Sequence, residues 1–188
     1  SAKSYKFLVN NKIDLRELNY KPYPFLLANA FEKKVLDLPI NDFQFEWKWD
    51  GIRIQLIKRL GKVSIWTRGQ DLVNNSFPEL EENTLSIKDD FVIDGELLIW
   101  NFKDQLPMNF SLLQKRINRK APSKSIQKNF PIIFIAYDLL ELKGEDKREI
   151  DLKHRRILLE KNFNKWINSS KKDISSVFKI SNLLFPKT

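Results

Sequence analysis

Residues 43–53 read FQFEWKWDGIR, and the rest of the chain is interpreted from this stretch. Aromatic and polar residues alternate from Phe43 to Asp50, which predicts a strand with four rings on one face and four polar groups on the other. Gly51 interrupts the alternation, so we expect a turn or bulge there, where glycine tolerates unusual backbone angles. Lys48 is a candidate nucleophile, because aromatic surroundings and nearby cations help an amine to lose its proton.

The pattern on both sides of this stretch predicts a mixed α and β domain. Residues 91–100 and 132–140 are almost continuously apolar, as expected of central strands buried on both faces. Taken together, the patterns favour an α+β fold with antiparallel or mixed sheets and flanking helices. The expected strands cover residues 43–58, 62–68, 91–100 and 131–142, and the expected helices cover residues 25–38, 109–120 and 152–166.

Composition excludes several classes of protein. The chain has 188 residues, of which 42% are hydrophobic, so it can build a real core. The absence of cysteine excludes disulfides and thiolate metal sites, and a single histidine excludes histidine clusters and a Ser-His-Asp triad of the usual kind. No apolar run approaches the ~20 residues that span a bilayer. We therefore expect a cytoplasmic protein that does not enter the membrane.

The net charge of +9 is concentrated in one window. Residues 105–137 contain no Asp or Glu but six Lys or Arg, four of them on or near the expected helix 109–120. This helix has either a solvated basic face or a surface that contacts nucleic-acid phosphates. The candidate nucleic-acid contacts are Lys115, Arg116, Arg119 and Lys120.

The residues around Lys48 resemble a known motif. EWKWDGIR at 46–53 matches the pattern E-x-K-x-D-G-x-R of covalent nucleotidyltransferases, which comprise DNA ligases, RNA ligases and mRNA-capping guanylyltransferases. Companion motifs follow in the expected order: TRG at 67–69, DGE at 94–96 and FIAYDLL at 134–140. From Tyr20 to Leu184 the chain is similar to the ATP-grasp-like adenylation domain of bacterial ATP-dependent DNA ligases.

The resemblance implies a three-step ligation of nicked double-stranded DNA. Lys48 attacks the α-phosphate of ATP and forms a covalent lysyl-AMP, with Mg²⁺ or Mn²⁺ as the metal. AMP then passes to a DNA 5′-phosphate, which the 3′-hydroxyl attacks. The remaining implied roles are Glu46 at the adenine edge, Arg53 and Arg68 on ribose or phosphate oxygens, Glu96 on the ribose or a metal, and Tyr137, where many relatives carry Phe, stacked on adenine.

The chain also departs from the family pattern. It contains no Glu-Gly pair for the later E-G-x-x-x-K motif, and we expect the OB-fold domain of the family to be absent from these residues. We expect residues 1–24 to be a lead-in or linker and residues 25–188 to be an adenylation domain that lacks its last motifs. We also expect a monomer, with weak or no activity from these residues alone, whose parent serves DNA repair, recombination or replication.

Alternatives remain within and outside this family. An RNA ligase or a capping-type nucleotidyltransferase shares the lysine motif, although the stretches between the motifs look like DNA ligases. A non-catalytic basic module that binds nucleic acid is the alternative from another class, and an unreactive Lys48 would support it.

Overall fold

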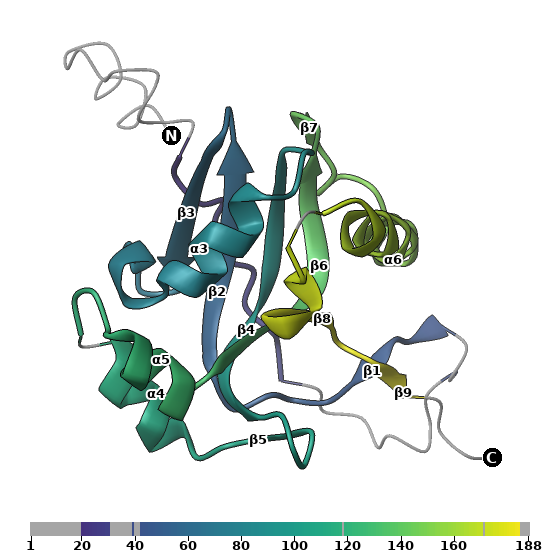
Figure 1. Ribbon diagram of the computed structural model, residues 1–188. Helices are drawn as coiled ribbons and strands as arrows, with labels where there is room; N and C mark the ends of the chain where they lie inside the picture. The colour runs from purple at the N-terminus through teal and green to yellow at the C-terminus, as the bar shows by residue number, and fades with distance from the viewer. Residues whose placement is uncertain (1–19, 31–38, 40–41, 118, 171, 185–188) are drawn as a thin grey trace, which may run out of the picture.

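The structure is a computed structural model that describes residues 20–30, 39, 42–117, 119–170 and 172–184. A mixed sheet forms its centre. Its strand order is β3-β2-β4-β6-β7, with β5 beside β4 and β8 beside β6 (Figure 1). Only the β6–β8 pair is parallel among the pairs of this sheet. The strands are β2 (Ile52–Arg59), β3 (Lys62–Thr67), β4 (Phe91–Asn101), β5 (Leu106–Pro107), β6 (Ile132–Leu142), β7 (Glu145–Asp146) and β8 (Phe178–Ile180).

The two long apolar runs confirm the prediction of central strands. β4 lies between β2 and β6, and nearly all of its side chains are buried. β6 is buried along most of its length, with β4 on one side and β7 and β8 on the other. Gly95 allows these strands to approach, since an added Cβ would lie 2.4 Å from the Phe134 ring.

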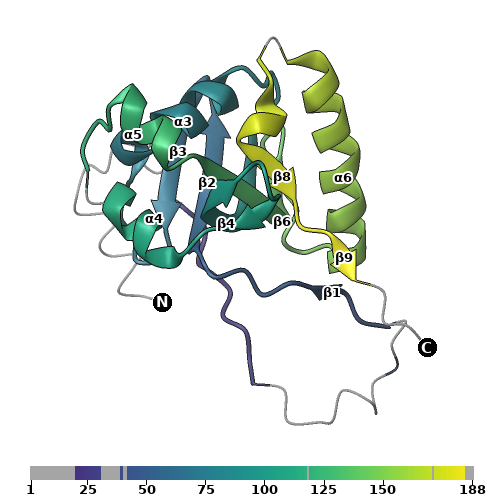
Figure 2. The same cartoon turned by 60° about the horizontal axis from the view of Figure 1, so that its bottom comes forward.

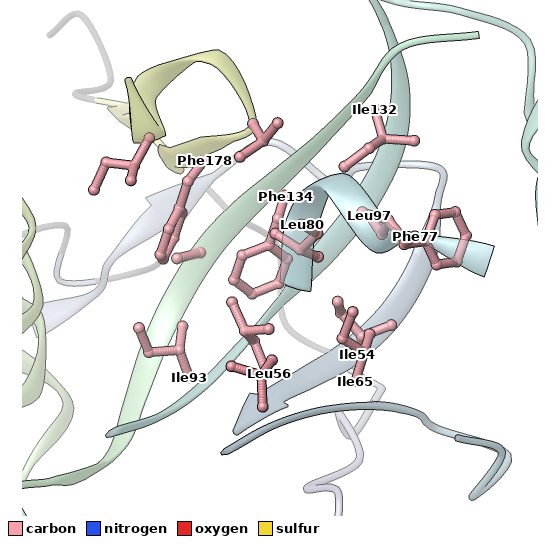
Figure 3. Packing of buried hydrophobic residues seen from close by; sticks show 14 of the residues in the cluster. Ile54, Leu56, Ile65, Phe77, Leu80, Ile93, Leu97, Ile132, Phe134 and Phe178 are labelled. Carbon is pink, nitrogen blue, oxygen red and sulfur yellow. The ribbon is translucent and has the colours of Figure 1, made fainter. Parts of the chain in front are cut away.

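The helices cover one face of this sheet. Ile54, Leu97 and Phe134 belong to the same core cluster as Leu80 of α3 and Trp166 of α6 (Figure 3 shows the first four). Because alternate residues of a strand point to opposite faces, the neighbouring strand residues face the other side. The helices are α3 (Pro78–Leu85), α4 (Phe110–Ile117), α5 (Lys124–Asn129) and α6 (Leu152–Ser169), and short 3₁₀ turns cover Asn74–Ser76 and Ile174–Ser176.

Two helix predictions need correction at their boundaries, and two helices were not predicted. α4 ends at Ile117, so Arg119 and Lys120 follow it and do not extend it. α6 begins at Leu152 as expected, where Asp151 caps it by accepting a hydrogen bond from the His154 N–H at 2.9 Å, but it continues to Ser169, three residues beyond the expected end. The sequence did not predict α3 and α5. None of the helices in the described ranges is long and apolar enough to cross a bilayer.

The expected strand from residue 43 to 50 is wrong for most of its length. Only β1 (Phe45–Glu46) is a strand, paired antiparallel with β9 (Leu183–Leu184) in a small sheet apart from the large one (Figure 2). The continuous wall of aromatic rings does not form, since Phe43 is 44% and Trp47 62% exposed.

Glycine at position 51 is required for a reason that the sequence did not show. An added Cβ would lie 2.3 Å from the carbonyl oxygen of Leu97, so the backbone approaches β4 too closely for any side chain. Gly51 is also absent from the glycines with positive φ, so the unusual backbone angle that we expected does not explain it.

Residues 20–26 make contacts with the sheet. The expected helix 25–38 is absent from residues 25–30, and the rest of it falls outside the described residues. Gln55 binds the backbone of Tyr23 on both sides, accepting from its N–H at 2.8 Å and donating to its carbonyl at 3.1 Å. Trp66 donates to the Tyr20 carbonyl at 2.6 Å. Residues 20–24 are therefore attached to the domain by specific hydrogen bonds.

Candidate active site

A pocket of about 670 Å³ opens on the face of the sheet opposite the helices. It brings together all six side chains that the sequence assigned to nucleotide binding. Three of them lie within residues 46–53, and the other three come from three motifs farther along the chain. The six are Glu46 of β1, Lys48 before β2, Arg53 of β2, Arg68 after β3, Glu96 of β4 and Tyr137 of β6.

Lys48 lies in the connection between β1 and β2. Its side chain is exposed, and among the described residues its ammonium makes no hydrogen bond. The connection is fixed three residues later, where the Gly51 N–H donates to Oε1 of Glu96 at 3.2 Å. This anchor holds the lysine segment against β4 while leaving the amine open to the pocket.

Glu96 is the most strongly perturbed acid of the pocket. Burial raises its pKa to about 7, and the hydrogen bond from Gly51 and the positive charges of Arg53 and Lys48 only partly oppose this rise. Asp94 raises the pKa further by repulsion. The carboxyl group of Glu96 therefore changes charge near neutral pH.

Arg53 and Asp94 form a nearly buried ion pair between β2 and β4. The guanidinium donates to both carboxylate oxygens, from Nε at 3.1 Å and from Nη2 at 2.7 Å, and Nη1 donates to the Leu26 carbonyl at 2.6 Å. Burial raises the pKa of Asp94, although the Arg53 charge opposes this. A guanidinium has five N–H groups, so two remain for a bound molecule.

Tyr137 closes the pocket on the β6 side. Its hydroxyl donates to Oδ1 of Asp94 at 3.3 Å, and the Arg53 guanidinium lies 5.9 Å from the centre of its ring. Burial raises the pKa of the phenol above its usual value, so the hydroxyl stays neutral at physiological pH. The ring is held from two sides and can serve as a stacking surface.

Glu46 and Arg68 complete the pocket at its rim. Gln44 donates a short hydrogen bond to Oε1 of Glu46, and Oε2 lies 3.7 Å from Nη1 of Arg156. The backbone N–H of Arg68 donates to the Arg53 carbonyl at 3.1 Å. The Arg68 side chain is exposed, and no partner for it is found within the described part of the chain.

The sequence missed several residues of the pocket. Asp94 was quoted within a motif but received no role, although a carboxylate inside an apolar run signals a buried partner. Asp138 binds Arg155 through both oxygens at 2.7 and 2.9 Å, and nothing in the local sequence marked that contact. Arg148 and Glu149, near the start of α6, also line the pocket without a prediction.

The residues fit a metal ion only together with a substrate. No group of three or more His, Asp or Glu side chains converges anywhere in the described ranges. Mg²⁺, however, is commonly held by one or two carboxylates and the phosphates of a nucleotide. Glu96 supplies one such carboxylate in the pocket that Lys48 lines.

The basic window lies on α4 and the residues after it, and one of its four candidate contacts is wrong. Lys115, Arg119 and Lys120 are exposed, but Arg116 is fully buried. Its guanidinium donates to the carbonyl oxygens of Phe130 at 2.9 Å and Ser76 at 3.0 Å, and to Glu79 at 2.6 Å. Arg116 follows Leu113 by three positions and so shares the inward face of the helix.

Comparisons with known proteins show the family of the chain. Residues 24–185 match the family model described as the ATP dependent DNA ligase domain. A probable DNA ligase of Opitutus terrae is 39% identical over 62% of the chain, and one of Koribacter versatilis is 37% identical over 75%. The chain spans only 11% and 24% of those two proteins.

Solved structures show the same fold. The ligase domain of LigD from M. tuberculosis superimposes with a TM-score of 0.57 and 25% identity, over 76% of this chain and 41% of that one. A mycobacterial DNA ligase D complexed with ATP and MES gives a TM-score of 0.54 and 26% identity, over 75% of this chain and 40% of that one. These matches confirm the predicted mixed α and β class.

Proposed function

Since the chain belongs to the family of ATP-dependent DNA ligase domains, we propose that its pocket binds ATP and transfers AMP to Lys48. One observation carries the proposal: six side chains from four separate motifs meet in one pocket, and the exposed lysine is one of them. A solvated basic surface would not require this convergence. The pocket therefore disfavours the non-catalytic binding module.

The first step forms one bond and breaks another. The neutral amine of Lys48 attacks the α-phosphorus and a P–N bond forms, the bond to the bridging oxygen breaks as pyrophosphate leaves, and the nitrogen releases one proton to solvent. Arg53 has two N–H groups left and Arg68 has its whole guanidinium, and both can donate to phosphate or ribose oxygens. A Mg²⁺ or Mn²⁺ ion, held by Glu96 and the nucleotide phosphates, would offset negative charge at the reacting phosphate.

Base binding uses two further side chains of the same pocket. The Tyr137 ring would stack on adenine, and Glu46 would accept a hydrogen bond from the base edge. Glu96, tied to Gly51, is placed to bind the ribose hydroxyls as an alternative to the metal. These roles follow the sequence motifs, and the shared pocket supports them.

The later steps and the cellular setting extend the proposal to the whole protein. The bound AMP passes to the 5′-phosphate of nicked double-stranded DNA, and the 3′-hydroxyl then displaces it. Relatives named DNA ligase favour this substrate over RNA or a cap. We propose that Lys115, Arg119 and Lys120 contact the DNA backbone, and that the protein acts as a cytoplasmic monomer in DNA repair, recombination or replication.

Nucleotide binding tests the assignment of the pocket. ATP binding to the chain is measured by calorimetry for the unmodified protein, Tyr137→Phe and Tyr137→Leu. Tyr137→Phe keeps the ring and should bind within about twofold, whereas Tyr137→Leu should lose on the order of tenfold in affinity. Equal ATP affinity in all three proteins would remove Tyr137 from the site.

A further inference from the structure

Two consecutive arginines of helix α6 each contact an acidic residue that lines the proposed base pocket. Arg155 donates two hydrogen bonds to Asp138, the residue after Tyr137. Arg156 approaches Glu46 on β1, 110 positions earlier in the chain (156 − 46 = 110), at 3.7 Å. The ring expected to stack on the base and the carboxylate expected at the base edge are therefore both attached to one helix.

Arg156 is fixed by contacts that leave one part of its guanidinium unused. Nε donates to Glu160 at 2.6 Å, and Nη2 donates to the Ser181 carbonyl at 2.6 Å. The side chain is only 7% exposed. Nη1, in contrast, is buried and has no hydrogen-bond partner among the described residues. The unused nitrogen is the one that faces Glu46.

Glu46 shows the complementary pattern. Its Oε1 accepts from Gln44, whereas Oε2 is buried and has no hydrogen-bond partner in the described part of the structure. Separating these two groups would leave the Glu46 carboxylate without its cationic partner and both buried atoms without compensation, which is unfavourable. The ion pair therefore fixes the orientation of the Glu46 carboxylate. Oε2 faces Arg156, and Oε1 faces Gln44, which also lines the pocket.

A carboxylate held in this way can select a base. Ionised carboxylate oxygens only accept hydrogen bonds, and each can accept more than one. Oε1 can thus accept from an amino group in addition to Gln44. Adenine carries an amino donor at its 6-position, whereas hypoxanthine and guanine carry a carbonyl acceptor there, which would face the carboxylate with like partial charge. A polar site that hydrogen-bonds one ligand rejects an analogue that cannot complete the bond.

We propose that Arg156 is the positioning residue for base selection, because it fixes Glu46 so that its carboxylate accepts a hydrogen bond from a 6-amino purine and disfavours a 6-oxo purine. Arg156 acts through Glu46 and does not itself touch the nucleotide. This inference rests on the proposed function of the pocket as an ATP site, and it adds the residue that sets the base preference.

The test compares ATP with inosine triphosphate, which replaces the 6-amino group with an oxygen. Both affinities are measured by calorimetry for the unmodified chain, Arg156→Met, Arg156→Lys and Glu46→Gln. Lys153→Met is the matched control, because it removes one positive charge from an exposed position of the same helix. Thermal unfolding of each variant is recorded in parallel.

The preference ratio separates a positioning role from a structural one. Arg156→Met should weaken ATP binding on the order of tenfold and leave inosine triphosphate nearly unchanged, so that the preference for ATP collapses. Arg156→Lys should retain most of the preference, Lys153→Met all of it, and Glu46→Gln should lose it. The double variant Glu46→Gln/Arg156→Met should be no worse than Glu46→Gln, because both changes remove one interaction.

Two other results overturn the proposal in different ways. If Arg156→Met lowers both affinities equally, or only the melting temperature, then Arg156 supports the fold and does not set selectivity. If the unmodified chain binds neither nucleotide, the proposed function itself fails. If Arg156→Met does not fold, the ratio measured for Arg156→Lys and Glu46→Gln decides, and an unchanged ratio in Glu46→Gln refutes the proposal.

Discussion

Glu96 accepts a hydrogen bond from the backbone N–H of Gly51 at 3.2 Å, and this contact connects β4 to the segment that carries Lys48. The same carboxyl group has a pKa raised to about 7 by burial. The bond that orders the lysine segment therefore ends on a group whose charge changes close to physiological pH.

A pH dependence of stability follows from Glu96. Its pKa is raised on folding from 4.5 to about 7, so between these values the folded protein binds more protons than the unfolded chain. Stability then falls as pH rises through this window. In urea titrations, the unfolding free energy of the unmodified protein minus that of Glu96→Gln should decrease from pH 4.5 to 7 and level off above it.

Comparison with Glu96→Gln isolates this group from the other carboxylates, several of which have lowered pKa values and titrate at lower pH. If the difference between the two proteins rises over this range, the Glu96 carboxyl group is stabilised in its charged form and the assignment of burial as the dominant cause is wrong.

Arg116 should matter for stability and not for DNA. Replacing it with methionine leaves Glu79 and two carbonyl groups without their donor, at a cost of about 3 to 5 kcal/mol in unfolding free energy. Lys115→Met, one position earlier on the exposed face, should change the unfolding free energy by less than about 0.5 kcal/mol. Chemical unfolding of both variants checks this, and equal costs would contradict the buried placement of Arg116.

The exposed cations of the basic window should act together on DNA affinity. Lys115→Ala combined with Arg119→Ala should weaken binding to DNA of any sequence and reduce the slope of log affinity against log salt by roughly 2. Lys103→Ala with Lys161→Ala removes the same charge outside the window and serves as the control. If the salt slope of the Lys115→Ala/Arg119→Ala variant is unchanged, this surface is a solvated basic face that does not contact DNA.

The sequence predicted the strands that consist almost entirely of apolar residues, because such composition indicates burial. β4 and β6 are almost continuously apolar, and this composition is enough to predict a strand inside a sheet. The alternating residues 43–50 carried an equally clear pattern, yet a strand forms only where a partner exists. Only Phe45 and Glu46 meet one, in the two residues of β9.

For the candidate site too, the sequence predicted the residues that belong to local motifs but not the long-range contacts between them. Its six motif residues could be collected from the sequence, because each motif carries its own signal. The contacts that position them could not, since Arg156 and Glu46 or Arg53 and Asp94 meet only through the register of distant elements. Arg116 was within reach, because its spacing from Leu113 already placed it on the inward face of α4.

The central claim is that Lys48 carries the transferred nucleotide, and one labelling experiment tests it most directly. The chain is incubated with Mg²⁺ and ATP labelled at the α-phosphate, then denatured, and retained label is counted. We expect slow, substoichiometric labelling that survives denaturation, is released by acid and is abolished in Lys48→Ala and Lys48→Arg. Label that persists in Lys48→Ala, or saturated ATP binding without any label that depends on Lys48, would contradict the account.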